Sequence, residues 1–96
     1  MGEPWLYTSE VRFVGRRNED GEKFALYLCA IVSSSDELAP RVQSVISAFQ
    51  LVALGKPVIR NIDKGVPLSD PRILRVVADA EKSGVGHIVF QVLPDS

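Results

Sequence analysis

The order of its apolar segments constrains the fold of this chain more than any single residue does. Alternating or continuous apolar runs predict four strands, at residues 11–14, 24–32, 57–62 and 87–93. Apolar side chains at three- and four-residue spacing predict helices at 38–54 and 73–83. The expected order is therefore β-β-α-β-α-β, in a single domain over residues 1–96. The apolar segment 1–8 is expected to extend the first strand, or to pack through its tryptophan on the core or on a partner.

Two strand-helix-strand connections of this length favour parallel pairing of the strands that they join. We therefore expect an α/β or α+β fold, a two-layer sandwich in which two helices pack on one four-stranded mixed sheet. The strand at 57–62 alternates apolar and polar residues, which is typical of a position at or near the edge.

The strands at 24–32 and 87–93 are apolar on both of their alternating sets of side chains. Both faces of the sheet therefore need a cover. Either the two helices flank the sheet, or a second copy of the chain covers a bare face. The second alternative predicts a homodimer.

The apolar pattern also predicts which helical side chains are buried. Phe49 lies at the centre of the apolar stripe of the helix at 38–54, and Leu51 and Leu54 widen the stripe near its end. We therefore expect Phe49 to be a core residue. The buried face of the second helix is expected to contain Ile73, Leu74, Val77 and Ala78.

Charge excludes a globally basic nucleic-acid-binding protein. Eleven Lys and Arg residues against twelve Asp and Glu residues give a formal net charge of −1, so no overall field attracts phosphates. A basic surface has to be local, and five residues on the first hairpin and around the third strand could form one: Arg16, Arg17, Lys56, Arg60 and Lys64. Phosphate contacts from so few cations predict weak, salt-sensitive binding of nucleic acid.

A second candidate site lies in the loops at 33–36 and 63–70, which each lead into a helix. Helix starts offer free N–H groups to anions. Serine hydroxyls and one lysine could add to them, and the residues concerned are Ser33, Ser34, Ser35 and Lys64. This arrangement would suit a small anion, or a catalytic site that binds one.

No catalytic motif is present. The sequence contains no G-x-G-x-x-G, P-loop or nucleophile elbow. His87 and Cys29 are the only histidine and cysteine, and neither belongs to a metal-ligand spacing, so we expect no metal, no cofactor and no catalytic residue.

A single cysteine in an apolar strand favours a reducing compartment, and we expect a cytoplasmic protein without a membrane span.

Three functions remain open at this point. The sequence favours a non-enzymatic cytoplasmic assembly or binding module that acts as a homo-oligomer, with itself or another protein as its partner. The first alternative is a nucleic-acid-binding protein that uses the five basic residues. The second is a small-anion-binding or catalytic domain that uses the two loops.

Overall fold

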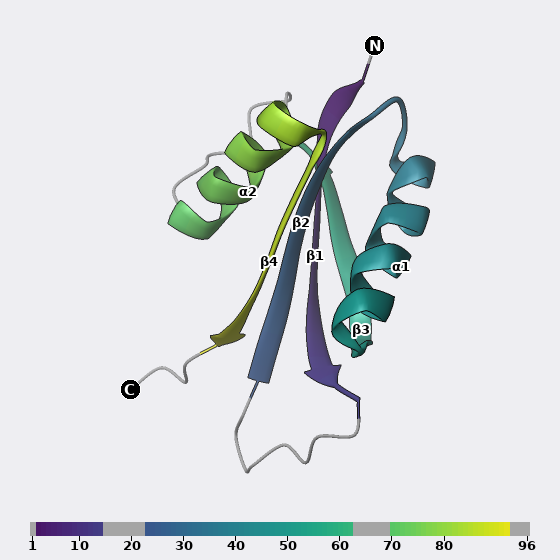
Figure 1. Cartoon of the computed structure of the whole chain (residues 1–96), viewed down its shortest axis with the longest axis vertical. Helices are drawn as coiled ribbons and strands as arrows, with labels where there is room; N and C mark the ends of the chain where they lie inside the picture. The colour runs from purple at the N-terminus through teal and green to yellow at the C-terminus, as the bar shows by residue number, and fades with distance from the viewer. Residues whose placement is uncertain (1, 15–22, 63–69, 93–96) are drawn as a thin grey trace.

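A computed structural model describes residues 2–14, 23–62 and 70–92 of the chain, which form four strands and two helices (Figure 1). The elements in chain order are β1 (Glu3–Phe13), β2 (Lys23–Val32), the short 3-10 turn η1 (Ser35–Glu37), α1 (Leu38–Phe49), β3 (Leu51–Asn61), α2 (Pro71–Ser83) and β4 (Val85–Val92). The predicted α+β fold, with one four-stranded sheet and the order β-β-α-β-α-β, is confirmed.

The strands lie in the order β3-β1-β2-β4, and all three pairings are antiparallel. The expected parallel pairing, and with it the mixed sheet, is therefore wrong. The β1–β2 hairpin fills the centre of the sheet, so a strand that arrives through a helix can add only at an outer edge. Consequently β1 separates β2 from β3, and α2 connects one edge of the sheet to the other. The edge position expected for the third strand is correct.

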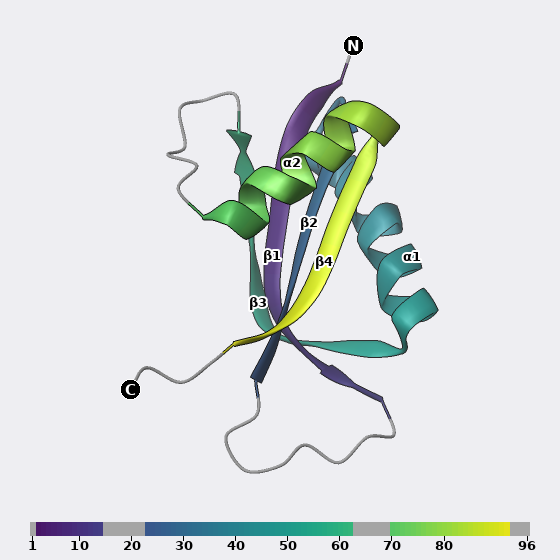
Figure 2. The ribbon, with the colours of Figure 1, turned by 60° about the vertical axis from the view of Figure 1, so that its left-hand side comes forward.

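The two helices cover opposite faces of the sheet, as Figures 1 and 2 show from two directions. The helix-on-sheet packing expected for the sandwich occurs on both faces, so the described residues form three layers: α1, the sheet and α2. Of the two ways to cover the doubly apolar β2, the structure has the one in which the helices flank the sheet. A second copy is therefore not needed to cover this strand.

Each face has its own apolar core. The α1 side contains the larger one, built from Tyr7, Val11, Phe24, Leu26, Leu28, Ala30, Val32, Leu38, Val42, Val45 and Leu51. The α2 side contains Leu6, Cys29, Val76, Val77 and Ala80. Trp5 lies within β1 and packs against the core on the α1 side, so segment 1–8 contributes most of its residues to the first strand.

Helix α1 ends at Phe49, five residues before the predicted end. Gln50 adopts a left-handed conformation with φ 54°, its N–H donates to helical carbonyls, and its own carbonyl accepts a 2.7 Å hydrogen bond from Val14 N–H. Leu51 then begins β3 opposite Phe13. The apolar pattern runs on through this turn because the following strand also needs apolar residues. The predicted burial of Phe49 is wrong, since 47% of its surface is exposed.

Helix α2 begins at Pro71. Asp70 precedes it as the capping residue, and its side chain accepts a 2.9 Å hydrogen bond from Arg72 N–H. Its buried residues are Val76, Val77 and Ala80. Leu74 and Ala78, which were expected on the buried face, are exposed. Helix α2 is therefore rotated about its axis, so that it buries a different face from the expected one. The rotation follows from how α2 packs against β4.

Gly86 on β4 allows this packing. A Cβ atom placed there would lie 2.4 Å from the Val76 carbonyl oxygen and 2.6 Å from Asp79 Cβ. Only a residue without a side chain allows the backbones of α2 and β4 to approach so closely. The close approach directs Val76 and Ala80, both fully buried, into the sheet.

Candidate functional site

The five predicted nucleic-acid contacts are only partly described by the structure. Lys56 and Arg60 are exposed on β3. Arg16, Arg17 and Lys64 lie outside the described residues. The basic surface therefore stays a prediction.

The serine-rich start of η1 already holds a carboxylate from the same chain. The amide groups of Ser33 and Ser34 both donate to Glu37 Oε2, the latter at 3.2 Å. Ser35 lies beside them at the start of η1, whereas Lys64 is outside the described residues. An external anion would have to compete with Glu37, because the same N–H groups cannot serve both. The anion site at 33–36 stays a prediction.

The starts of the two helices lie on opposite faces of the sheet, as Figure 1 shows. The loop before α1 and the Asp70 cap of α2 therefore do not form one joint site. Each helix start instead adjoins a cavity of its own.

Cys29 and His87 have unrelated surroundings. Cys29 is fully buried on the α2 side, and burial, followed by the negative charge of Glu81, raises the pKa of its thiol to about 11. His87 is exposed on β4, and its ring lies 5.4 Å from the Phe49 ring. Within residues 2–14, 23–62 and 70–92, no three His, Cys, Asp or Glu side chains gather closely enough to bind a metal ion.

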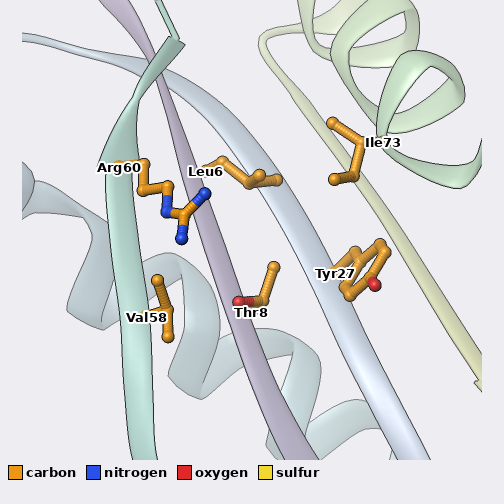
Figure 3. A pocket seen from close by; sticks show the side chains of 6 residues that line it. All are labelled: Leu6, Thr8, Tyr27, Val58, Arg60 and Ile73. Carbon is orange, nitrogen blue, oxygen red and sulfur yellow. The ribbon is translucent and has the colours of Figure 1, made fainter. Parts of the chain in front are cut away.

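An open hollow of about 200 Å³ lies on the α2 side of the sheet, and Figure 3 shows it from close by. We call it the α2-side hollow, and its lining residues are Leu6, Thr8, Tyr27, Val58, Arg60 and Ile73. It forms because α2 packs mainly on β4 and β2 and leaves the β3 side of the face without a helix (Figures 1 and 2).

The lining of the α2-side hollow is mainly apolar, with the hydroxyls of Thr8 and Tyr27 and one cation. Leu6 on β1 is 3% exposed, and Ile73 on α2 and Val58 on β3 add further apolar surface. The guanidinium of Arg60 extends from β3 over the hollow toward Leu6 (Figure 3). Among the described residues, no acidic side chain pairs with Arg60, whose guanidinium carries five N–H donors.

On the opposite wall, the Tyr27 hydroxyl is paired with Asp70, which does not itself line the hollow. The Tyr27 hydroxyl donates to Asp70 Oδ2 at 3.4 Å, and Asp70 Oδ1 accepts from Arg72 N–H. Burial, and then the adjacent Asp70 carboxylate, raise the pKa of the Tyr27 phenol above its ordinary value of 10.0. Tyr27 is therefore a neutral donor at physiological pH, and the Asp70 carboxylate beside it accepts hydrogen bonds from Tyr27 and Arg72.

A wider groove of about 480 Å³ lies on the other face, between α1 and β3. Its lining is mainly apolar and consists of Tyr7, Ser35, Asp36, Leu38, Ala39, Val42, Gln43, Ile46, Pro57 and Ile59. Ile59 at its rim is 43% exposed. From the turn that joins them, α1 and β3 run apart, as Figures 1 and 2 show, and the groove lies between them.

The two edges of the sheet differ in chemistry. On β3, Gly55 has φ 70°, and Lys56 and Pro57 follow it where the pairing with β1 shifts between Thr8 and Glu10. Irregular backbone, lysine and proline are features that keep an edge strand from pairing with another chain. In contrast, β4 keeps one continuous register with β2 over its whole length. Its sequence, VGHIVFQV, contains no proline, lysine or acidic residue.

Aromatic rings lie beside β4 on both faces of the sheet. On the α1 side, half-exposed Phe49 contacts His87. On the α2 side, Phe90 meets Tyr27 edge to face at 4.8 Å, and the Arg72 guanidinium lies 4.3 Å from the Phe90 ring centroid. Aromatic side chains therefore flank the β4 edge on both faces of the sheet.

Sequence reasoning named Arg60 only as a contact for nucleic acid and did not predict the α2-side hollow. A detectable signal was present, because Thr8, Tyr27 and Arg60 are polar residues within mainly apolar strands. What the pattern could not supply was the antiparallel pairing that makes them neighbours.

Neither helix in the described part of the chain is long and apolar enough to cross a membrane. The described residues offer three candidate surfaces, namely the hollow, the groove and the β4 edge, and the basic and serine-rich segments stay predictions. No protein-family model matches this chain, and no curated protein or solved structure matches it either.

Proposed function

We propose that this protein is a non-enzymatic assembly module that works as a homodimer, with two copies joined along their β4 strands. The observation that carries the proposal is the difference between the two sheet edges. A regular, uncharged edge strand presents a row of unpaired N–H and C=O groups to a second strand. β4 has that character over Val85–Val92, whereas β3 has Gly55, Lys56 and Pro57 in its course.

A second copy of the same chain is a suitable partner for such an edge. Two identical strands that pair antiparallel about a two-fold axis satisfy each other's free groups, and no surface remains to propagate the contact. The two four-stranded sheets would then form one continuous sheet, and the protected β3 strands would be its outer edges.

The flanks of β4 support the same partner. Phe49 and His87 on one face, and Phe90 on the other, would pack against their counterparts across the two-fold axis. The sequence suggested a homodimer for a different reason, namely that a second copy could cover a bare apolar face of the sheet. The apolar second face of the sheet is covered by α2, and residues 51–54 belong to β3 rather than to a helix end.

The function of such a dimer would be to present paired surfaces, with a groove and a hollow from each copy. The cytoplasm is the proposed location, because the one cysteine is a buried free thiol that suits a reducing compartment.

Sedimentation or light scattering at tens of micromolar protein tests the proposal. His87→Lys with Gln91→Lys puts two charges on exposed positions of β4, where the copies would repel each other. Ala53→Lys with Ile59→Lys puts the same two charges on exposed positions of β3 and is the matched control. We expect a dimer for the wild type and the β3 variant, and a folded monomer for the β4 variant.

A monomeric wild-type protein would contradict the proposal. So would a dimer that persists in the β4 variant. Dissociation by the β3 variant alone would assign the interface to the other edge. Circular dichroism on each variant establishes that the monomer retains its fold.

A further inference from the structure

We propose that the α2-side hollow binds a small organic carboxylate with a compact apolar body. This inference is independent of the dimer, because the hollow lies between α2 and β3, away from the β4 edge. It rests on the size of the hollow, the chemistry of its walls and the Arg60 cation, which has no acidic partner in the described part of the chain.

The size of the hollow limits the ligand to a small molecule. An engineered apolar cavity of about 150 Å³ accommodates benzene in another protein. At about 200 Å³, the hollow has room for a ring of that size together with a carboxylate group.

The walls suit an apolar body on one side and an anion on the other. Leu6, Val58 and Ile73 supply apolar contact from three different elements. Val58 is 46% exposed, so a ligand would remove apolar surface from water. Thr8 adds a hydroxyl beside this apolar surface.

Arg60 makes the hollow selective for an anion. Its guanidinium lies over the hollow and has no acidic partner within the described residues. A planar guanidinium can donate two parallel hydrogen bonds to a carboxylate, which makes this pairing strong and directional. The carboxylate of the ligand would therefore lie toward β3.

Asp70, which contacts the lining residue Tyr27, does not oppose this orientation. Asp70 is outside the lining, behind Tyr27, and Tyr27 O–H and Arg72 N–H donate to it. Tyr27 is on β2, two strands away from Arg60 on β3, a separation of about 10 Å between strand backbones. The ligand carboxylate at Arg60 would thus lie at the end of the hollow opposite Tyr27, the residue that contacts Asp70.

The experiment uses the full chain and sodium benzoate as the probe, with amide chemical shifts and calorimetry as the readouts. We expect benzoate to shift the amide signals of Leu6, Thr8, Tyr27 and Ile73. Benzamide, which has the same shape without the charge, and acetate, which has the charge without the ring, should each bind about tenfold more weakly or worse.

Two variants on β3 separate the role of Arg60 from a general charge effect. Arg60→Gln should weaken benzoate binding about tenfold or more, and because Arg60 is exposed, the unliganded protein should keep its unfolding temperature. Lys56→Gln removes the same charge from the same strand but outside the lining, and it should leave binding unchanged.

Several outcomes would overturn the assignment. They are the absence of any benzoate-induced shift at millimolar concentration, equal binding of benzoate and acetate, and equal effects of the two variants. Shifts confined to residues outside the lining would also refute it. None of these readouts depends on the oligomeric state, so the hollow and the dimer can fail separately.

Discussion

Leu38 and Phe49, at opposite ends of α1, are both apolar but differ in burial. We expect burial, rather than hydrophobicity alone, to set how much each side chain contributes to stability. Leu38 is 1% exposed, whereas Phe49 is 47% exposed. Leu38→Ala should lower the free energy of unfolding by about 2–5 kcal/mol, because it removes buried methyl groups and leaves a cavity. Phe49→Ala should cost about 1 kcal/mol, because half of the ring is already in water. Urea titration of both variants checks the order, and an equal loss would contradict the described burial.

Cys29 predicts how stability responds to alkaline pH. Its pKa rises from an ordinary value of 9.0 to about 11 in the folded chain. Between about pH 9 and pH 11 the folded protein keeps a proton that the unfolded chain has lost, so rising pH favours unfolding. Urea titrations in this window should show stability falling with pH.

Cys29→Ala serves as the control for this dependence. The variant should show a smaller decrease across the same window, and the part that remains belongs to other groups such as Tyr27, whose pKa is also raised. An unchanged pH dependence in the variant would exclude Cys29 as a contributor.

At the scale of elements, the contact between α2 and β4 depends on one glycine. A methyl group at Gly86 would collide with the Val76 carbonyl oxygen and with Asp79 Cβ, so helix and strand would have to separate. Gly86→Ala should therefore lower the free energy of unfolding by about 1–3 kcal/mol. Gln91→Ala on the same strand is exposed and should cost much less. Chemical denaturation compares the two, and a harmless Gly86→Ala would show that the close approach is wrong.

The ends and faces of the elements show where sequence reasoning succeeds and where it fails. The start of α2 follows from local chemistry, because Asp70 caps it and Pro71 fits its first turn. The end of α1 was misplaced, because Leu51 is apolar whether it continues a helix or begins a strand. The exposure of Leu74 was missed, since the rotation of α2 is set by its contact with β4.

At the scale of the molecule, the proposed dimer makes thermal stability depend on concentration. A partner that binds only the folded chain raises the unfolding temperature as protein concentration rises. The wild type should show this rise over a hundredfold dilution series followed by calorimetry. The His87→Lys and Gln91→Lys variant should show a constant unfolding temperature. A constant value for the wild type would speak against the dimer.

The sequence by itself determined the number, type and order of the elements, because apolar periodicity and capping residues act over a few neighbouring positions. It also indicated that β2 is covered on both faces and that β3 is near an edge. Only the tertiary structure decided the antiparallel order β3-β1-β2-β4 and the placement of one helix on each face. Strand order depends on which edges remain free after β1 and β2 have paired. This is a long-range property, and the spacing of apolar residues within one segment does not encode it. The hollow beneath Arg60 and the unprotected edge of β4 are consequences of that order.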